Sequence, residues 1–285
     1  MSAPDSAAPQ GVDAAVDVAR DYYNSSDADH FYFHVWGGED IHVGLYRDDH
    51  EAIAPASRRT VERMVERLTR LNANARVLDI GAGYGGSMRY LAKTVGCHCV
   101  ALNLSEVENQ RDRAMNAEQG LDHLIDVVDA SFETLDYPDN HFDVVWSQDA
   151  ILHSGRRAQV LAEVHRVLKP GGEFVMTDPM AADDCPEGVL DPILARIHLQ
   201  SLGTPGFYIR TATELGMEDV GFEDHSHQLT RHYGRVREEL TRLAPQLKGK
   251  VSDDYVTRMK TGLGHWVTGG ENGHLAWGIF LFRKR

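Results

Sequence analysis

Three glycines after a short apolar run are the first residues whose types and spacing indicate chemistry. Gly81, Gly83 and Gly85 form a G-x-G-x-G pattern that directly follows the β-rich run at residues 76–80. Glycines let a ligand come close to the backbone, and a helix that begins after them presents free N–H groups. The pattern therefore predicts a strand, a turn and a helix that together bind a nucleotide-type ligand.

Asp79 indicates which kind of ligand this turn suits. It precedes the turn inside the predicted strand. A carboxylate there attracts the cationic end of an amino acid and repels a pyrophosphate. The turn is therefore expected to hold a nucleoside joined to a cationic group, in preference to two linked phosphates.

A parallel sheet is needed to position these residues. An amphipathic helix is expected over residues 56–71, and predicted strands and helices alternate after it. Such alternation is typical of an α/β fold in which helices cover both faces of a parallel sheet. The strands are expected at residues 76–80, 98–103, 125–129, 142–147 and 173–177, and the intervening helices at 87–95, 105–119 and 155–168.

The remaining segments are expected to cover this core, which occupies residues 56–177. Residues 22–55 are rich in aromatic rings and are expected to form an N-terminal cover. Residues 178–221 are expected to form a helical insertion over the C-terminal edge of the sheet, where ligands of open α/β sheets bind. Residues 1–21 are expected to be flexible, and residues 22–285 to form one domain. Its other predicted helices lie at 190–202, 212–215, 233–247 and 253–266, and its other strands at 222–229 and 275–282.

Composition limits the class of protein. The chain has 285 residues, of which 42% are hydrophobic and 25% charged, as in ordinary globular proteins. No apolar run approaches the roughly 18 residues that a spanning helix needs, and no secretory signal is predicted. The formal net charge of −14 repels nucleic acid and anionic membranes, so neither is expected as a partner. Three cysteines cannot form a disulfide framework, which favours a cytoplasmic location.

No metal site is predicted. His225 and His227 alternate on an expected strand and could supply two ligands. No third ligand is spaced nearby, however, and the chain contains no H-E-x-x-H pattern. The chemistry is therefore expected to proceed without a metal ion.

The pattern DIGAGYGG at residues 79–86 resembles motif I of the class I S-adenosylmethionine-dependent methyltransferases. Further segments follow in the family's order, ending with the LKPGG run at residues 168–172. The resemblance implies a Rossmann-like fold with a mostly parallel seven-stranded sheet. It also implies S-adenosyl-L-methionine as cofactor and S-adenosyl-L-homocysteine as product. The cofactor-binding residues that it implies are Asp79, Gly81, Ala82, Gly83, Gly85, Asn103, Leu104, Asp129, Ala130, Ser131, Phe132 and Gln148.

Individual roles follow from the same resemblance. The family usually has an acidic residue for the ribose hydroxyls where this chain has Asn103, an amide without charge. Asp129 is expected to accept a hydrogen bond from the adenine amino group, and Phe132 to pack on the adenine ring. Gln148 ends the fourth strand and is expected to face the methyl group.

Four further segments narrow the resemblance. VWGGEDIH at residues 35–42, WSQDAILHS at 146–154, TDPM at 177–180 and the C-terminal run from Gly262 look like sarcosine/dimethylglycine N-methyltransferases. The similarity covers almost all of residues 22–285. Those enzymes make glycine betaine, an osmolyte. The resemblance therefore implies dimethylglycine, and also sarcosine, as the methyl acceptor, and the protein is expected to be a monomer or homodimer.

A proton has to leave the acceptor, because an ammonium group has no lone pair to attack the methyl group. His153 is the expected proton acceptor, since imidazole titrates near neutrality. The alternative is a structural hydrogen bond, and an amine that binds already neutral needs no base. Gln148 is the second residue expected at the reacting centre.

The product is a quaternary ammonium ion, which aromatic faces attract. The alternative role for the rings is to pack the N-terminal cover onto the sheet. Two residues after the fifth strand are expected to border the acceptor, and an arginine of the insertion to hold its carboxylate. The expected acceptor-site residues besides His153 are Tyr32, Trp36 and Tyr208 for the cation, Pro179 and Met180 for the border, and Arg196 for the carboxylate.

Three other functions stay open at this point. The protein could methylate another small molecule at nitrogen or carbon, which an acceptor panel would separate. A nicotinamide-dependent dehydrogenase would have an acid at the position of Asn103, and this chain has an amide there. A protein that binds S-adenosylmethionine only to regulate a partner would transfer nothing.

Overall fold

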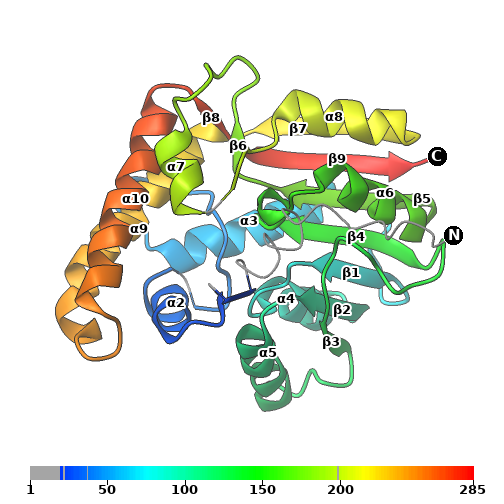
Figure 1. The fold of residues 1–285 in the computed structure, drawn as a ribbon. Coiled ribbons are helices and arrows are strands. Elements are labelled where there is room, and N and C mark those ends of the chain that lie inside the picture. Colours follow the sequence, from blue (N-terminus) through cyan, green and yellow to red (C-terminus); the bar gives the residue numbers. More distant parts are fainter. Residues whose placement is uncertain (1–19, 22, 37, 198) are drawn as a thin grey trace, which may run out of the picture.

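A seven-stranded sheet forms the centre of the structure, a computed structural model that describes residues 20–21, 23–36, 38–197 and 199–285 (Figure 1). The strand order is β3-β2-β1-β4-β5-β9-β7, and β9 alone runs antiparallel to its neighbours. This confirms the predicted mostly parallel seven-stranded sheet. The strands are β1 Arg76–Ile80, β2 His98–Asn103, β3 Ile125–Asp129, β4 Phe142–Gln148, β5 Leu168–Thr177, β7 Met217–Asp224 and β9 Gly278–Lys284.

Helices cover both faces of this sheet because each central strand buries apolar residues on both sides. On one face, Val77 and Val144 pack with α3 (Ile53–Arg67) and α4 (Gly86–Thr94). On the other face, Leu78 packs with α6 (Arg157–Val167) and α8 (Pro205–Glu214). The helix α5 (Glu106–Glu118) contacts β2 and β3. Strands buried on both faces are typical of parallel sheets.

The sheet has its topological switch point at β1. The next strand, β2, pairs with one side of β1, whereas β4 pairs with the other side. The connections that leave the carboxyl ends of β1 and β4 therefore diverge, and a crevice opens between them. The glycine-rich turn at residues 81–85 lies at this crevice.

A separate helical layer covers the carboxyl ends of the parallel strands (Figure 1). It contains a third apolar core, distinct from those on the two faces of the sheet. The N-terminal cover contributes α2 (Ser26–Phe31) and a π-helical turn, η1 (Tyr32–Trp36). The C-terminal half contributes the other helices: α7 (Asp191–Arg196), α9 (Ser226–Leu247) and α10 (Asp253–Glu271).

The segment predicted as one insertion, residues 178–221, divides between two places. A short ladder of β6 (Met180–Ala181) with β8 (Leu275–Ala276) and the helix α7 lie at the carboxyl end of the sheet. The helix α8, by contrast, contacts β7 and α6. It begins well before the predicted residue 212, because proline suits the first turn of a helix and the Thr204 side chain accepts from the N–H of Phe207.

The strand predicted at residues 222–229 is shifted. β7 ends at Asp224, whose carboxylate accepts hydrogen bonds from the backbone N–H and the hydroxyl of Ser226, and α9 begins there. His227 therefore lies on a helix and His225 precedes it, so the two histidines do not alternate on a strand. Among the described residues, no group of three or more His, Cys, Asp or Glu side chains could hold a metal ion.

The remaining differences concern lengths. α7 is shorter than its prediction of 190–202, and α10 continues five residues beyond the predicted 266. Within the described part of the chain, no helix combines the length and apolar character needed to cross a bilayer. The flexible segment predicted for residues 1–21 lies outside the described residues, except for its last two.

Candidate active site

Two adjoining cavities lie under the helical layer. The glycine-turn cavity, of about 940 Å³, is lined by the turn after β1 and by residues that follow β2, β3 and β4. The aromatic cavity, of about 800 Å³, is lined by residues of η1, α7, α9 and α10. The two cavities meet at the residues that line both of them, which are Tyr23, Ile41, Asp149 and His153.

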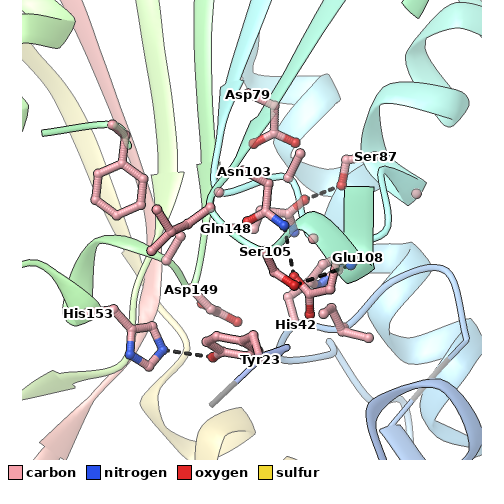
Figure 2. A pocket seen from close by; sticks show the side chains of 18 of the residues that line it. Tyr23, His42, Asp79, Ser87, Asn103, Ser105, Glu108, Gln148, Asp149 and His153 are labelled. Atoms are coloured by element: carbon pink, nitrogen blue, oxygen red, sulfur yellow. Dashed lines mark hydrogen bonds between the residues drawn. The ribbon is translucent and has the colours of Figure 1, made fainter. Parts of the chain in front are cut away.

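Asp79 supplies the glycine-turn cavity with a buried carboxylate (Figure 2). Only 3% of the residue is exposed, and its Oδ1 has no hydrogen-bond partner among the described residues. Burial, and secondarily the carboxylate of Asp112, raises the pKa of Asp79 well above its usual range. A bound cation would compensate for this burial, as the sequence predicts.

Gln148 supplies the same cavity with a donor. Its Oε1 accepts a hydrogen bond from the Ser87 hydroxyl (Figure 2). It accepts a second one from Trp146 Nε1. Its Nε2 is buried and has no acceptor among the described residues. Asp79 and Gln148 thus offer one free acceptor and one free donor, which complement the ammonium and carboxylate of an amino acid. Gln148 does not line the aromatic cavity.

Gly81, Ala82 and Gly83 line the glycine-turn cavity, but Gly85 does not. Gly85 is the residue before α4 and has a φ of +72°, a conformation that favours glycine. A Cβ atom there would lie 2.2 Å from Oδ1 of Asp112. Gly85 therefore shapes the turn without lining the cavity itself.

Asn103 and Leu104 also line this cavity, and Glu108 joins them (Figure 2). Asn103 Nδ2 donates to Glu108 Oε2 at 2.8 Å. Burial raises the pKa of Glu108 to about 7, against the lowering effect of this hydrogen bond. A carboxylate is therefore present although residue 103 is an amide. The sequence signal that could have found it is the S-x-x-E pattern that begins with Ser105, the N-cap of α5.

Two of the four residues predicted to bind the cofactor at the end of β3 and just after it line the glycine-turn cavity. Ser131 and Phe132 line the glycine-turn cavity, whereas Asp129 and Ala130 do not. The carboxylate of Asp129 points toward α5, where it accepts from Arg113 and, at 2.8 Å, from Asn109 Nδ2. The structure therefore places the Asp129 carboxylate against α5, outside the lining of the glycine-turn cavity, and its contact with an adenine amino group stays a prediction.

Aromatic rings from three elements form the walls of the second cavity. Tyr32 and Trp36 come from η1, with ring centroids 5.3 Å apart. Tyr233 of α9 and Trp266 of α10 stack with centroids 4.8 Å apart. Sequence reasoning missed Tyr233 and Trp266, since aromatic residues at helical spacing are also typical of a core. Trp36 Nε1 is buried and has no acceptor among the described residues.

His153 lies where the two cavities meet, and its Nε2 is 2.9 Å from the hydroxyl of Tyr23 (Figure 2). Desolvation, together with the positive charges of Arg157 and Arg196, lowers the pKa of His153 to about 4. The imidazole is therefore neutral at pH 7. Its pKa lies too low for the imidazole to change its charge near neutrality.

Asp149 also lies at this junction, within the WSQDAILHS run, although the sequence predicted no role for it. Its backbone has a φ of +51°, which is unusual for a residue other than glycine. Its carboxylate accepts from the N–H of Val43 at 2.7 Å, from Thr177 Oγ1 at 2.8 Å and from Trp277 Nε1 at 2.8 Å. Three distant segments thus hold a carboxyl group between the two cavities, where burial raises its pKa and these hydrogen bonds act against that rise. Strained backbone of this kind concentrates at functional sites.

Of the four other residues predicted to contact the acceptor, two line the aromatic cavity and two do not. Pro179 and Arg196 line the aromatic cavity. Met180 and Tyr208 do not: both are fully buried in the core between the sheet and α6 and α8. The hydroxyl of Tyr208 donates to Asp178 Oδ2 at 2.6 Å. Their predicted contacts with an acceptor are therefore corrected, because packing on the sheet holds them away from the cavity.

Comparisons with known proteins agree with this geometry. A family model described as a methyltransferase domain matches residues 78–176. The sarcosine/dimethylglycine N-methyltransferase of Halorhodospira halochloris is 63% identical over 95% of this chain and 98% of its own length. The enzyme of the same description from Aphanothece halophytica is 53% identical over 95% and 98%. A crystal structure from Galdieria sulphuraria, of a candidate sarcosine dimethylglycine methyltransferase, has a TM-score of 0.88 and 42% identity over 92% of this chain and 98% of that one. These similarities extend over nearly the whole chain, which therefore belongs to the sarcosine/dimethylglycine N-methyltransferase family.

Proposed function

We propose that this protein transfers a methyl group from S-adenosylmethionine to the amine of dimethylglycine, and also of sarcosine, with glycine betaine as the final product. The observation that carries the proposal is the composition of the aromatic cavity. It combines aromatic walls, the acid Asp149 at its junction with the glycine-turn cavity, and the base Arg196. A small amino acid with a cationic or quaternary nitrogen has the matching groups.

The glycine-turn cavity suits the methyl donor. Asp79 is available to the ammonium group of the donor, and Gln148 Nε2 to its carboxylate. Glu108 offers the ribose hydroxyls the carboxylate that Asn103 lacks, and Phe132 offers a flat face for the adenine. S-adenosylmethionine supplies an activated methyl group on a cationic sulfur.

The residues of the chain contribute mainly position and exclusion of water. The two cavities meet at Tyr23, Asp149 and His153, so an amine between the aromatic rings lies next to the glycine-turn cavity. Correct alignment of two bound reactants can lower a barrier by about 7 to 11 kcal/mol in favourable cases. In its ionised form, the carboxylate of Asp149 favours the positive charge that moves to the acceptor nitrogen.

The proposal is tested by mass spectrometry of reactions that contain the purified protein, S-adenosylmethionine and either dimethylglycine or sarcosine. Formation of betaine from dimethylglycine, and of dimethylglycine and then betaine from sarcosine, is expected. A panel of other amines and of carbon acceptors separates the proposal from its closest alternative. Tight binding of S-adenosylmethionine without transfer to any acceptor would instead indicate a regulator.

His153 is expected to act as a neutral hydrogen-bonding residue. Since its pKa is lowered to about 4, kcat/KM for dimethylglycine should show no inflection from His153 between pH 6 and pH 8. His153→Gln should lower turnover less than about tenfold, the effect of one neutral hydrogen bond, without changing the shape of the profile. An inflection near pH 6.5 in the wild type that the variant loses would restore His153 as the proton acceptor. Tyr23→Phe removes the bonding partner and serves as the control.

Trp36 is expected to contribute its indole N–H as well as its ring. Trp36→Phe keeps an aromatic face but removes the unpartnered donor, so KM for dimethylglycine should rise about 2- to 10-fold, as for one lost hydrogen bond. The affinity for S-adenosylmethionine, measured by calorimetry, should stay the same. Unchanged acceptor kinetics would assign Trp36 to packing alone.

We also propose that the protein is cytoplasmic and is a monomer or a homodimer. All three cysteines, Cys97, Cys99 and Cys185, are free thiols, which supports a reducing compartment such as the cytoplasm. Cell fractionation tests the location. Light scattering during size-exclusion chromatography distinguishes the proposed monomer from the homodimer.

A further inference from the structure

Gly262 lies on the face of α10 that borders the aromatic cavity. Leu263 and Trp266 of this helix line the cavity, and Met259 lies one turn before Leu263. Gly262 belongs to the same face by its spacing and is buried. A glycine inside a helix is unfavourable for the helix itself, so its presence calls for a reason in the packing.

The packing around Gly262 supplies that reason. A Cβ atom at Gly262 would lie 2.0 Å from Cδ and 2.2 Å from Nε of Arg196. The Arg196 side chain therefore occupies the space that any other residue at position 262 would fill. Its Nη2 contacts the sulfur of Met259, one turn earlier on α10. The surface of α10 thus forms a slot for the Arg196 side chain, bounded by Gly262 and Met259.

Arg196 has the Met259 sulfur as its side-chain partner and no carboxylate partner among the described residues, although it lines the aromatic cavity. Other arginines of the chain, such as Arg89 and Arg111, form ion pairs with buried or half-buried acids. A guanidinium group held against a cavity without such a partner is available to an anionic ligand, which it can bind through two parallel hydrogen bonds.

We propose that Gly262 is a positioning residue of the acceptor site. Its missing side chain lets Arg196 lie along α10 and present its guanidinium group to the carboxylate of the acceptor. This inference rests on the proposed function, because it assumes an acceptor that carries a carboxylate. It predicts that selectivity for a carboxylate depends on a residue that never contacts the acceptor.

The test compares Gly262→Ala with Gly264→Ala. Gly264 lies on the same helix but has only an ordinary contact, 3.7 Å, with Arg237, so its replacement controls for the change in helix propensity. Kinetics are measured with dimethylglycine and with N,N-dimethylglycinamide, which keeps the amine and replaces the carboxylate by a neutral amide. Calorimetry with S-adenosylmethionine reports whether each variant is folded and binds the methyl donor.

Gly262→Ala is expected to raise KM for dimethylglycine about 10- to 100-fold, the effect of losing a hydrogen bond to a charged group. KM for the amide, and affinity for S-adenosylmethionine, should stay within about twofold of the wild type, as for an independent site. Gly264→Ala should leave all three values unchanged. Equal KM values for dimethylglycine in the two alanine variants would overturn the proposal. An equal rise of KM for dimethylglycine and the amide would also overturn it.

A double-mutant cycle with Arg196→Ala shows whether Gly262 acts through the arginine. In the Arg196→Ala background, Gly262→Ala should cause no further rise in KM for dimethylglycine. Gly262→Ala by itself could be unstable, because the new Cβ atom collides with the Arg196 side chain. In that case the double variant, which lacks this side chain, should regain the melting temperature of Arg196→Ala. An additive effect on KM, or no such recovery, contradicts the proposal. A wild-type protein that methylates neither acceptor contradicts the proposed function itself.

Discussion

Asp79→Asn is expected to weaken binding of S-adenosylmethionine by at least about 100-fold. Removing one partner of a buried charge pair commonly costs about 3 to 5 kcal/mol, because the other charge is left without compensation. Asp79 is 3% exposed and its Oδ1 has no partner among the described residues, so neither water nor another side chain can replace it. The near-isosteric amide keeps the packing and removes only the charge.

Isothermal titration calorimetry of the wild type and the variant measures this effect. Asp129→Asn is the matched control, since Asp129 also ends a strand of the sheet but directs its carboxylate to Arg113 and Asn109. The control should bind the methyl donor with nearly wild-type affinity. Equal affinities in Asp79→Asn and the wild type would remove Asp79 from the site.

The wild type should also show a pH dependence that the variant lacks. Burial raises the pKa of Asp79 in the free protein, whereas a bound ammonium group favours the ionised carboxylate. Below that pKa the methyl donor therefore displaces a proton when it binds. Affinity should fall as the pH decreases through the pKa, and the heat of binding should depend on the ionisation enthalpy of the buffer.

Arg89→Met is expected to lower the free energy of unfolding by about 3 to 5 kcal/mol, the usual cost of leaving a buried charge unpaired. The Arg89 side chain is 1% exposed and lies 2.7 Å from the fully buried carboxylate of Asp112. It also donates to Asn116, Glu39 and the carbonyl of Tyr84. Through Asp112 this network supports the turn at Gly85, which has no space for a side chain.

Urea denaturation measures the loss, and Arg113→Met is the control. The Arg113–Asp129 pair is 43% exposed on both sides, and such surface pairs contribute less than about 1 kcal/mol. Burial already raises the pKa of Asp112 to about 6 with Arg89 present. Without Arg89 this carboxyl can stay neutral at low pH, so the loss should be smaller at pH 5 than at pH 8. Equal losses of unfolding free energy in Arg89→Met and Arg113→Met would mean that the buried pair stabilises the fold no more than the surface pair does.

Local patterns were sufficient to predict the central sheet. β1, β2 and β3 begin and end at their predicted residues, because short apolar runs between glycine-rich or polar turns are specified by neighbours in the sequence. The binding turn was predictable for the same reason, since Asp79 and the glycines lie within a few residues of one another. The shifted strand β7 was not, because its residues are mostly exposed or partly buried and carry no clear alternation of apolar side chains.

Which side chains face the cavities depends on contacts between distant segments. Asp129 and Tyr208 satisfied the sequence pattern, but Arg113 and Asp178 hold them away from the cavities. Tyr233 carried no signal, and Asp149 stood within the WSQDAILHS run without a role of its own, yet packing of the helical layer on the strand ends brings both to the acceptor side. The sequence therefore specified the fold and the binding turn for the methyl donor, whereas the acceptor cavity arises only when four separate stretches of chain meet. Residue type and spacing report local geometry, and a hydrogen bond across a hundred residues forms only once the chain has folded.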